Sequence, residues 1–593
     1  MPETGNLGLV SQSTARGRKL AILGSVVLGH VAFLAACSST TDTAQKPVVE
    51  QMATVDIKEP PPPPSAPPPP PPPGAAGETI TVTGARRTQQ NFESATPVMT
   101  VSGAPAAETA SADIAYAPPV VVPTDPGREQ YEAEEVSPVK LVSAEPVSTF
   151  SVDVDTGAYA NARRFLTQGL MPPRASVRTE EMINYFRYDY DAPTNSNVPF
   201  SVTTDVARSP WNDDTYLMRI GLRGYDIARE DRPPANLVFL MDVSGSMNSP
   251  DKLPLVKTAL SGLAGELGEQ DRVSIVVYAG AAGLVLEPTN DVREIRRALA
   301  QLSAGGSTAG GAGLELAYNI AEDNFIEGGV NRVILATDGD FNVGVSDRAS
   351  LVEMIESYRD RDITLTTLGF GTGNYNEAMM EQIANHGNGN YAYIDTALEA
   401  RKVLGDEMSS TLFTIAKDVK IQVEFNPAVI SQYRLVGYEN RALREEDFDN
   451  DAVDAGDIGA GHQVTAIYEI VPTGTRGWIA PRRYEDQPSA AATERMAEAA
   501  HVRLRYKLPD SDTSRLIERV VSTSELRRAT RPPRGDFAFA AAVAAYGQIL
   551  RGDELMMGYT HDDVSDLAGR QTDFWRQEFL ELNALAASMR GGG

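Results

Sequence analysis

The chain has 593 residues, which is too long for a single hydrophobic core and predicts several domains. Its 80 acidic residues outnumber its 53 basic residues and give a formal net charge of -27. Because nucleic-acid binding needs a basic surface, this balance argues against a nucleic-acid partner. Hydrophobic residues make up 42% of the sequence, which is enough for globular domains.

The N-terminus has the pattern of an export signal. A basic segment precedes an apolar stretch from Leu20 to Cys37, the single cysteine. The stretch ends in Leu-Ala-Ala-Cys, which resembles the lipobox of bacterial lipoproteins. The resemblance implies a signal peptide over residues 1–36, a lipid anchor on Cys37 and, because Ser38 follows, delivery to the outer membrane of a Gram-negative bacterium. The alternative is an uncleaved anchor, since the apolar run approaches the span of a bilayer.

Residues 37–145 have the composition of a disordered linker. Two proline runs, residues 60–64 and 67–73, predict a stiff polyproline spacer of roughly 40 Å. The segment Glu78–Gly103 resembles the energy-coupling box and early plug of TonB-dependent receptors, which implies a TonB-system contact through Glu78–Gly84. A strand-prone patch within the linker is the alternative interpretation.

Folded structure is expected to begin near residue 146. Residues 148–154 alternate like a strand, and Asp155 or Thr156 is expected to cap a helix over residues 157–168. A second helix is predicted over residues 178–185. Asp153 and Asp155 also permit a phosphotransfer site, but Thr156 stands one place too early for that motif. We therefore interpret them as a strand end and a helix cap.

Four segments alternate between apolar and polar residues, as strands of an antiparallel sheet do: residues 215–224, 419–425, 464–470 and 502–508. We expect residues 215–224 to have one wet face and to share a sheet with residues 419–425. The predicted β-sandwich comprises strands from residues 146–234 and 413–593. The segments between them, residues 235–412, form a separate domain inserted in the sandwich.

The sequence of the inserted domain predicts a doubly wound α/β fold with a mostly parallel sheet. Its strands are apolar without clean alternation, as expected for strands covered on both faces. They are expected at residues 236–242, 272–279, 331–340 and 363–371. Helices are expected at residues 252–267, 292–302, 312–324, 347–359, 377–386 and 397–412. Sheets of this kind bind ligands at the carboxyl ends of their strands.

The motif Asp-Val-Ser-Gly-Ser-Met follows the first of these strands. Asp242, Ser244 and Ser246 place three oxygen-bearing side chains in one tight loop. Hard cations such as Mg²⁺ prefer six oxygen ligands, so other loops must complete the shell. Thr308, just before a helix, and Asp338, at the end of another central strand, are the candidates.

This five-residue set resembles the metal-ion-dependent adhesion site of the von Willebrand factor type A (VWA) domain. The resemblance implies that Ser244, Ser246 and Thr308 bind Mg²⁺, or Mn²⁺ or Ca²⁺, through their hydroxyls. Asp242 and Asp338 would act through water. An ion bound by so few charges keeps an open position, which an Asp or Glu of a protein partner can fill.

The flanking segments resemble the N-terminal and C-terminal domains of a bacterial family of VWA proteins. Residues 148–193 carry the first likeness, and residues 476–484, 503–518 and 537–552 carry the second. Helical elements at both ends of the chain are therefore expected around the sandwich, with the resemblance covering about residues 146–590.

These features predict an envelope-anchored, metal-dependent protein-binding module rather than an enzyme. A metal-dependent hydrolase of the envelope is the alternative, but it would need a base or nucleophile beside the ion. The five histidines, His30, His386, His462, His501 and His561, all lie outside the metal loops. A scaffold for a partner ATPase is a third class, and export would remove the ATP that it needs.

Overall fold

The structure is a computed structural model. It describes residues 129–193, 198–307, 310–339, 348–480, 482, 489, 494–556 and 558–590. The predicted signal peptide, Cys37, the proline runs and Glu78–Gly84 lie outside the described residues, as does Thr308. Ordered contacts begin before the expected boundary at residue 146, because Gln130 donates its backbone N–H to the Tyr375 carbonyl at 2.9 Å.

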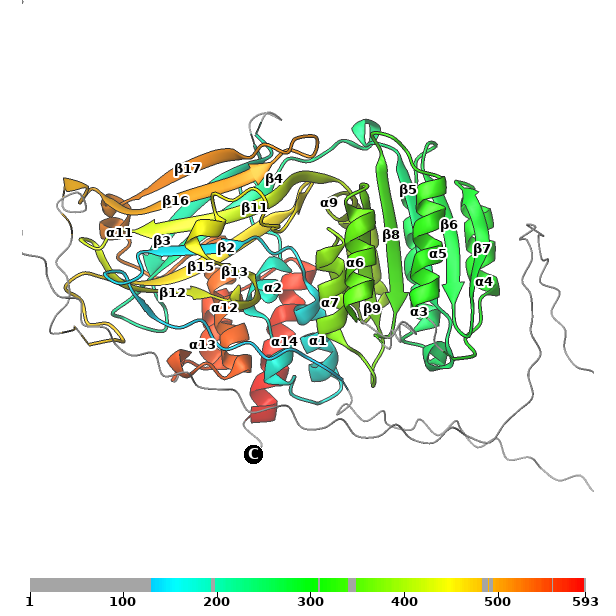
Figure 1. Cartoon of the computed structure of the whole chain (residues 1–593). Coiled ribbons are helices and arrows are strands. Elements are labelled where there is room, and N and C mark those ends of the chain that lie inside the picture. Colours follow the sequence, from blue (N-terminus) through cyan, green and yellow to red (C-terminus); the bar gives the residue numbers. More distant parts are fainter. Residues whose placement is uncertain are drawn as a thin grey trace, which may run out of the picture. The chain divides into compact units, whose positions relative to one another are not determined.

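A six-stranded sheet forms the centre of the inserted domain, in the order β10-β9-β8-β5-β6-β7 (Figure 1). All pairings are parallel except that of β6 with β7, which is antiparallel. The strands are β5 (Ala235–Asp242), β6 (Arg272–Tyr278), β7 (Ala282–Thr289), β8 (Val330–Thr337), β9 (Ile363–Phe370) and β10 (Tyr391–Ile394). The expected parallel strands are confirmed, whereas β7 and β10 were not predicted.

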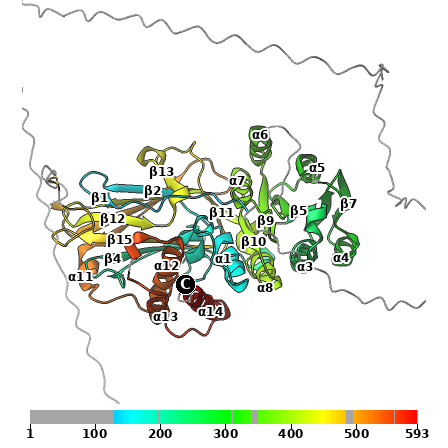
Figure 2. The same ribbon diagram turned by 90° about the horizontal axis from the view of Figure 1, so that it is seen from below.

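Helices cover both faces of this sheet, with α5, α6 and α7 on one side and α3, α4 and α8 on the other (Figure 2). Their bounds are α3 (Leu253–Leu263), α4 (Val292–Gln301), α5 (Gly310–Asp323), α6 (Arg348–Arg359), α7 (Glu377–His386), α8 (Ala397–Arg401) and α9 (Met408–Leu412). A π-helical turn, Lys402–Asp406, divides the last expected helix into α8 and α9. Phe239 of β5 packs into the core that includes α3 and α4, and its neighbour Leu240 into the core with α5 and α6. Burial on both faces explains why β5 lacks alternation.

Two further sheets form the sandwich, in the orders β1-β12-β15-β4-β3 and β13-β2-β11-β16-β17. The first contains β1 (Lys140–Leu141), β3 (Phe200–Arg208), β4 (Tyr216–Gly224), β12 (Ile430–Val436) and β15 (Gln463–Pro472). The second contains β2 (Val147–Ser151), β11 (Thr414–Phe425), β13 (Ala442–Leu443), β16 (Glu498–Lys507) and β17 (Arg515–Ser522), and β14 (Ile458–Gly459) also pairs with β11. All strand pairs in both sheets are antiparallel.

Two expectations about β4 were wrong. It pairs with β15 and lies in the opposite sheet from β11, although β15 also follows the inserted domain. It has no wet face either, because Leu217 packs into a helical core with Phe539, while Met218 packs into the sandwich core. The alternating side chains of β4 therefore face two different buried layers, and neither face of the strand is turned to solvent.

The helices that cover this face come from both ends of the chain and pack together (Figure 2). They are α1 (Gly157–Thr167), α2 (Thr179–Asn184), α12 (Gly535–Arg551), α13 (His561–Ala568) and α14 (Phe574–Arg590). The short helix α11 (Thr523–Arg528) instead packs Leu526 into the sandwich core. Thr156 is the N-cap residue of α1, one of the two expected positions, but it makes no side-chain cap bond. Glu181 of α2 accepts a hydrogen bond from the Ala158 N–H at 2.8 Å instead.

The two ends of the inserted domain meet, as expected for an insertion. The Arg232 guanidinium, just before β5, lies 5.9 Å from the ring centre of Phe413, just after α9. None of the helices in the described residues is long and apolar enough to cross a membrane.

Candidate metal site

Asp242 is the last residue of β5, which lies between β6 and β8 in the sheet. The chain passes from β5 to β6 on one side and later returns to β8 on the other. The strand order therefore reverses at β5, and the carboxyl end of such a strand is where doubly wound sheets bind ligands. The structure thus places the predicted aspartate at the expected edge.

Three neighbours fix the Asp242 carboxylate. Its Oδ1 accepts the Ser244 N–H at 2.8 Å, and its Oδ2 accepts the hydroxyls of Tyr278 at 3.2 Å and Thr337 at 3.1 Å. The side chain is fully buried, and this burial raises the pKa of Asp242 above its usual value, while the Ser244 bonds oppose the rise. The carboxylate is therefore held by hydrogen bonds that leave it little freedom to wrap around an ion.

The two serines of the motif lie side by side. Ser244 Oγ and Ser246 Oγ are 3.0 Å apart, with Ser244 buried and Ser246 exposed. The loop is tied to a neighbouring glycine-rich loop, because Gly245 N–H donates to the Gly306 carbonyl at 3.1 Å and Gly305 N–H to the Val243 carbonyl at 2.8 Å. The segment that leads to Thr308 is thus anchored to the serine loop.

Asp338 follows β8 directly and is fully buried. Its Oδ2 accepts a hydrogen bond from the Lys252 ammonium at 2.8 Å. Gly339 comes next with φ of +85°, and a Cβ there would lie 2.5 Å from the Asn376 backbone nitrogen. Only glycine can make this turn, so the backbone itself holds Asp338 at the end of its strand.

The donor set fits a hard cation. Hydroxyl and carboxylate oxygens are ligands that Mg²⁺, Mn²⁺ and Ca²⁺ accept. Of the predicted residues, the structure brings Asp242, Ser244, Ser246 and Asp338 to adjacent strand ends. No cluster of three or more His, Cys, Asp or Glu side chains suited to a metal occurs in the described part of the chain. The predicted site holds only two carboxylates.

Sequence reasoning missed three residues that shape this site: Tyr278, Thr337 and Lys252. Tyr278 and Thr337 end the strands on either side of β5, so their positions in neighbouring apolar runs were an available signal. The available signal for Lys252 was its position at the start of a predicted helix, which is an unfavourable place for a cation.

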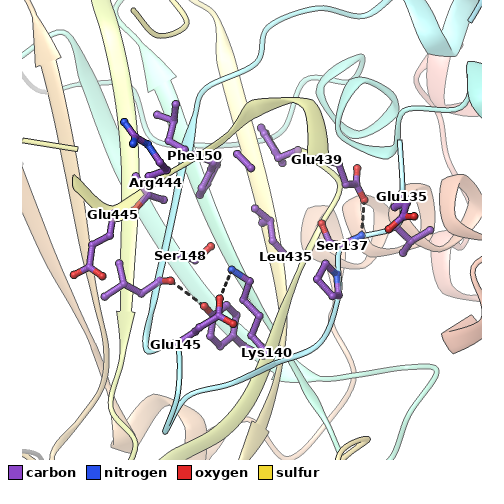
Figure 3. Close-up of a pocket in the computed structure, with 18 of the residues that line it drawn as sticks. Glu135, Ser137, Lys140, Glu145, Ser148, Phe150, Leu435, Glu439, Arg444 and Glu445 are labelled. Carbon is purple, nitrogen blue, oxygen red and sulfur yellow. Dashed lines mark hydrogen bonds and ion pairs between the residues drawn. The ribbon is translucent and has the colours of Figure 1, made fainter. Parts of the chain in front are cut away.

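A cavity of about 790 Å³ lies elsewhere, between the edges of the two sandwich sheets (Figure 3). Phe150 and Leu435 line it, and Lys140 and Glu145 form an ion pair of 2.8 Å in its wall. Its volume falls in the range of small-molecule sites. It shares no residue with the metal loops.

The sheet topology and the serine loop at its edge define the central domain as a VWA domain. The family profile described as "von Willebrand factor type A domain" matches residues 236–406. A second profile, "von Willebrand factor", matches residues 125–219, and a third, "Uncharacterized protein YfbK, C-terminal", matches residues 410–589.

The chain is 46% identical to Uncharacterized protein YfbK of Escherichia coli over 474 residues, which cover 78% of this chain and 82% of that protein. The chain therefore belongs to the YfbK family. It is also 34% identical to Uncharacterized protein sll0103 of Synechocystis over 186 residues, covering 31% of this chain and 43% of that protein. A solved structure titled von Willebrand factor type A from Catenulispora acidiphila aligns with 68% of this chain and 98% of its own, at 17% identity and a TM-score of 0.37.

Proposed function

We propose that this protein is an envelope-anchored, metal-dependent protein-binding module. Its VWA site would hold Mg²⁺, or Mn²⁺ or Ca²⁺, and capture an Asp or Glu side chain of a partner. The observation that carries the proposal is the pair of serine hydroxyls, 3.0 Å apart, beside a carboxylate whose oxygens are already engaged by Ser244, Tyr278 and Thr337.

In this proposal Ser244, Ser246 and Thr308 bind the ion directly, and Asp242 and Asp338 orient its waters. A divalent ion held mainly by neutral hydroxyls keeps most of its positive charge. It therefore attracts a carboxylate from outside the chain, and this electrostatic capture vanishes when the ion is removed.

Binding rather than hydrolysis is favoured because no histidine stands in residues 242–248, 305–308 or 337–339. The lipid anchor on Cys37 would hold the module at the outer membrane of a Gram-negative bacterium. A TonB-system contact through Glu78–Gly84 would be a separate function of the linker.

The test begins with calorimetric titration of Mg²⁺, Mn²⁺ and Ca²⁺ into the full chain. Asp242→Ala and Thr308→Ala should weaken metal binding. Thr258→Ala is a matched control, because Thr258 is exposed on α3 and its hydroxyl bonds the Pro254 carbonyl of its own helix. Wild-type protein that binds none of the three ions would overturn the proposal.

The second stage measures capture from envelope extract with and without EDTA. Capture should disappear with EDTA and in both site variants, while circular dichroism stays close to that of wild type. Capture that survives EDTA and Asp242→Ala would place the binding surface outside the metal site. A substrate turned over by wild type and not by the variants would favour the hydrolase instead.

A further inference from the structure

Lys252 is a buried cation at the start of a helix. It is the N-cap residue of α3, and its side chain is only 7% exposed. The amino end of a helix carries partial positive charge, which repels a lysine. Lysine is also among the residues least often buried without a partner. Both costs need a compensating anion.

The ammonium finds that anion in the candidate metal site. Lys252 Nζ donates to Asp338 Oδ2 at 2.8 Å and to Asn374 Oδ1 at 3.2 Å. The aliphatic stem reaches them by passing over Gly371, which has φ of +71°. A Cβ at residue 371 would lie 2.3 Å from Lys252 Cγ, so the glycine keeps the path open. The lysine stem thus packs directly against the Gly371 backbone.

This position changes the charge of the site. Asp242 and Asp338 together carry two negative charges, and Lys252 offsets one of them. A bound divalent ion then leaves the group with a net charge of +1, whereas without the lysine it would be neutral. A net positive, partly buried site needs an anion from elsewhere.

We propose that Lys252 is a positioning residue that keeps the metal site short of one negative charge, so that the bound ion recruits a carboxylate of the partner. This inference rests on the proposed metal site. Lys252 lowers metal affinity and in exchange raises the affinity of the loaded site for an external anion.

A purely structural ion pair is the competing explanation. Removing one member of a buried pair is destabilising, because the other charge is left without compensation. A structural role therefore predicts lower stability with unchanged or weaker metal binding. The counter-charge role predicts lower stability without metal but tighter metal binding.

The decisive variant is Lys252→Met in the full chain, which keeps much of the stem and removes the charge. Calorimetric titration with Mn²⁺ should show tighter binding than wild type. A cation within 4–6 Å of a carboxylate lowers the pKa of that carboxylate by one to three units, which is about a 10- to 1000-fold loss of proton affinity. Removing the Lys252 charge beside Asp338 should therefore tighten the binding of Mn²⁺ by a similar factor, about 10- to 1000-fold. Mn²⁺-dependent retention on an immobilised glutamate-rich peptide should fall in the same variant.

Lys257→Met is the matched control. Lys257 lies on the same helix, but its ammonium bonds the Leu302 carbonyl at the end of α4. Its loss should leave Mn²⁺ affinity unchanged. In EDTA, Lys252→Met should melt below wild type, and the added change Asp338→Asn should restore part of the loss by removing the uncompensated charge.

If Lys252→Met does not fold, Lys252→Gln replaces it, since the amide can still donate to Asp338 without carrying charge. Wild type that binds none of Mn²⁺, Mg²⁺ and Ca²⁺ would defeat the proposed function itself. Wild type that binds Mn²⁺ with an affinity that neither Lys252 variant increases would overturn this inference alone. Tighter Mn²⁺ binding with undiminished retention on the peptide would also overturn it.

Discussion

Glu377→Gln tests a cluster of buried acids between the VWA domain and the rest of the fold. Glu377 begins α7 and is fully buried. Burial raises its pKa to about 8 from the usual 4.5, nearby Glu381 adds to the rise, and Arg178 and Arg164 oppose it. The other charged groups of this cluster are Glu381 on α7 itself and groups from three other segments of the chain: Asp153, Asp155, Arg178, Glu180, Glu181 and Arg441.

The sign of the effect follows from proton binding. Between pH 4.5 and about 8 the folded protein keeps a proton on Glu377 that the unfolded chain releases. The contribution of Glu377 to the free energy of unfolding is therefore fully present below pH 4.5 and is lost as the pH rises towards 8. A shift of this size in a fully buried group corresponds to several kcal/mol, on the order of 5 at full ionisation. Glu180, whose burial raises its pKa to about 7, acts in the same direction.

Calorimetric melting in EDTA from pH 5 to pH 8.5 measures this loss while excluding metal binding. The neutral amide of Glu377→Gln cannot ionise, so the variant should lose less stability than wild type over this range. Glu353→Gln on the exposed face of α6 should behave as wild type. Equal pH dependence in wild type and Glu377→Gln would refute the reasoning.

Two further changes probe the helical core and the proposed lipid anchor. Phe579→Ala should cost about 3–5 kcal/mol in denaturant unfolding, because the fully buried ring packs against Phe539 and Tyr546 at 5.4 and 5.2 Å between ring centres. Phe574→Ala, at a residue 54% exposed, should cost much less, and equal losses would contradict this account of the core. Mass spectrometry of the membrane-extracted protein should find an acylated N-terminus at Cys37, absent in Cys37→Ser, and an intact Met1 would contradict lipidation.

The sequence alone was sufficient for the four central strands of the VWA sheet, β5, β6, β8 and β9, and for the location of Asp242, Ser244 and Asp338 at its edge. Continuous apolar runs report strands buried on both faces, because water is excluded from both sides of each residue. A polar motif directly after such a run must lie at the carboxyl edge of the sheet, where parallel strands end together. These features depend on residues that are close in sequence, so the spacing of apolar and polar residues is enough to predict them.

Only the tertiary structure decided which strand pairs with β4, what covers its second face and what neutralises Asp338. Alternation in β4 shows that its two faces differ, but two apolar layers of different composition produce the same pattern as core and solvent. Its partner β15 and its covering helix α12 lie more than two hundred residues further along the chain. Lys252 reaches Asp338 across 86 residues, because Gly371 leaves its stem a path. Contacts of this kind depend on how whole helices and strands pack together, and the spacing of apolar and polar residues does not predict that packing.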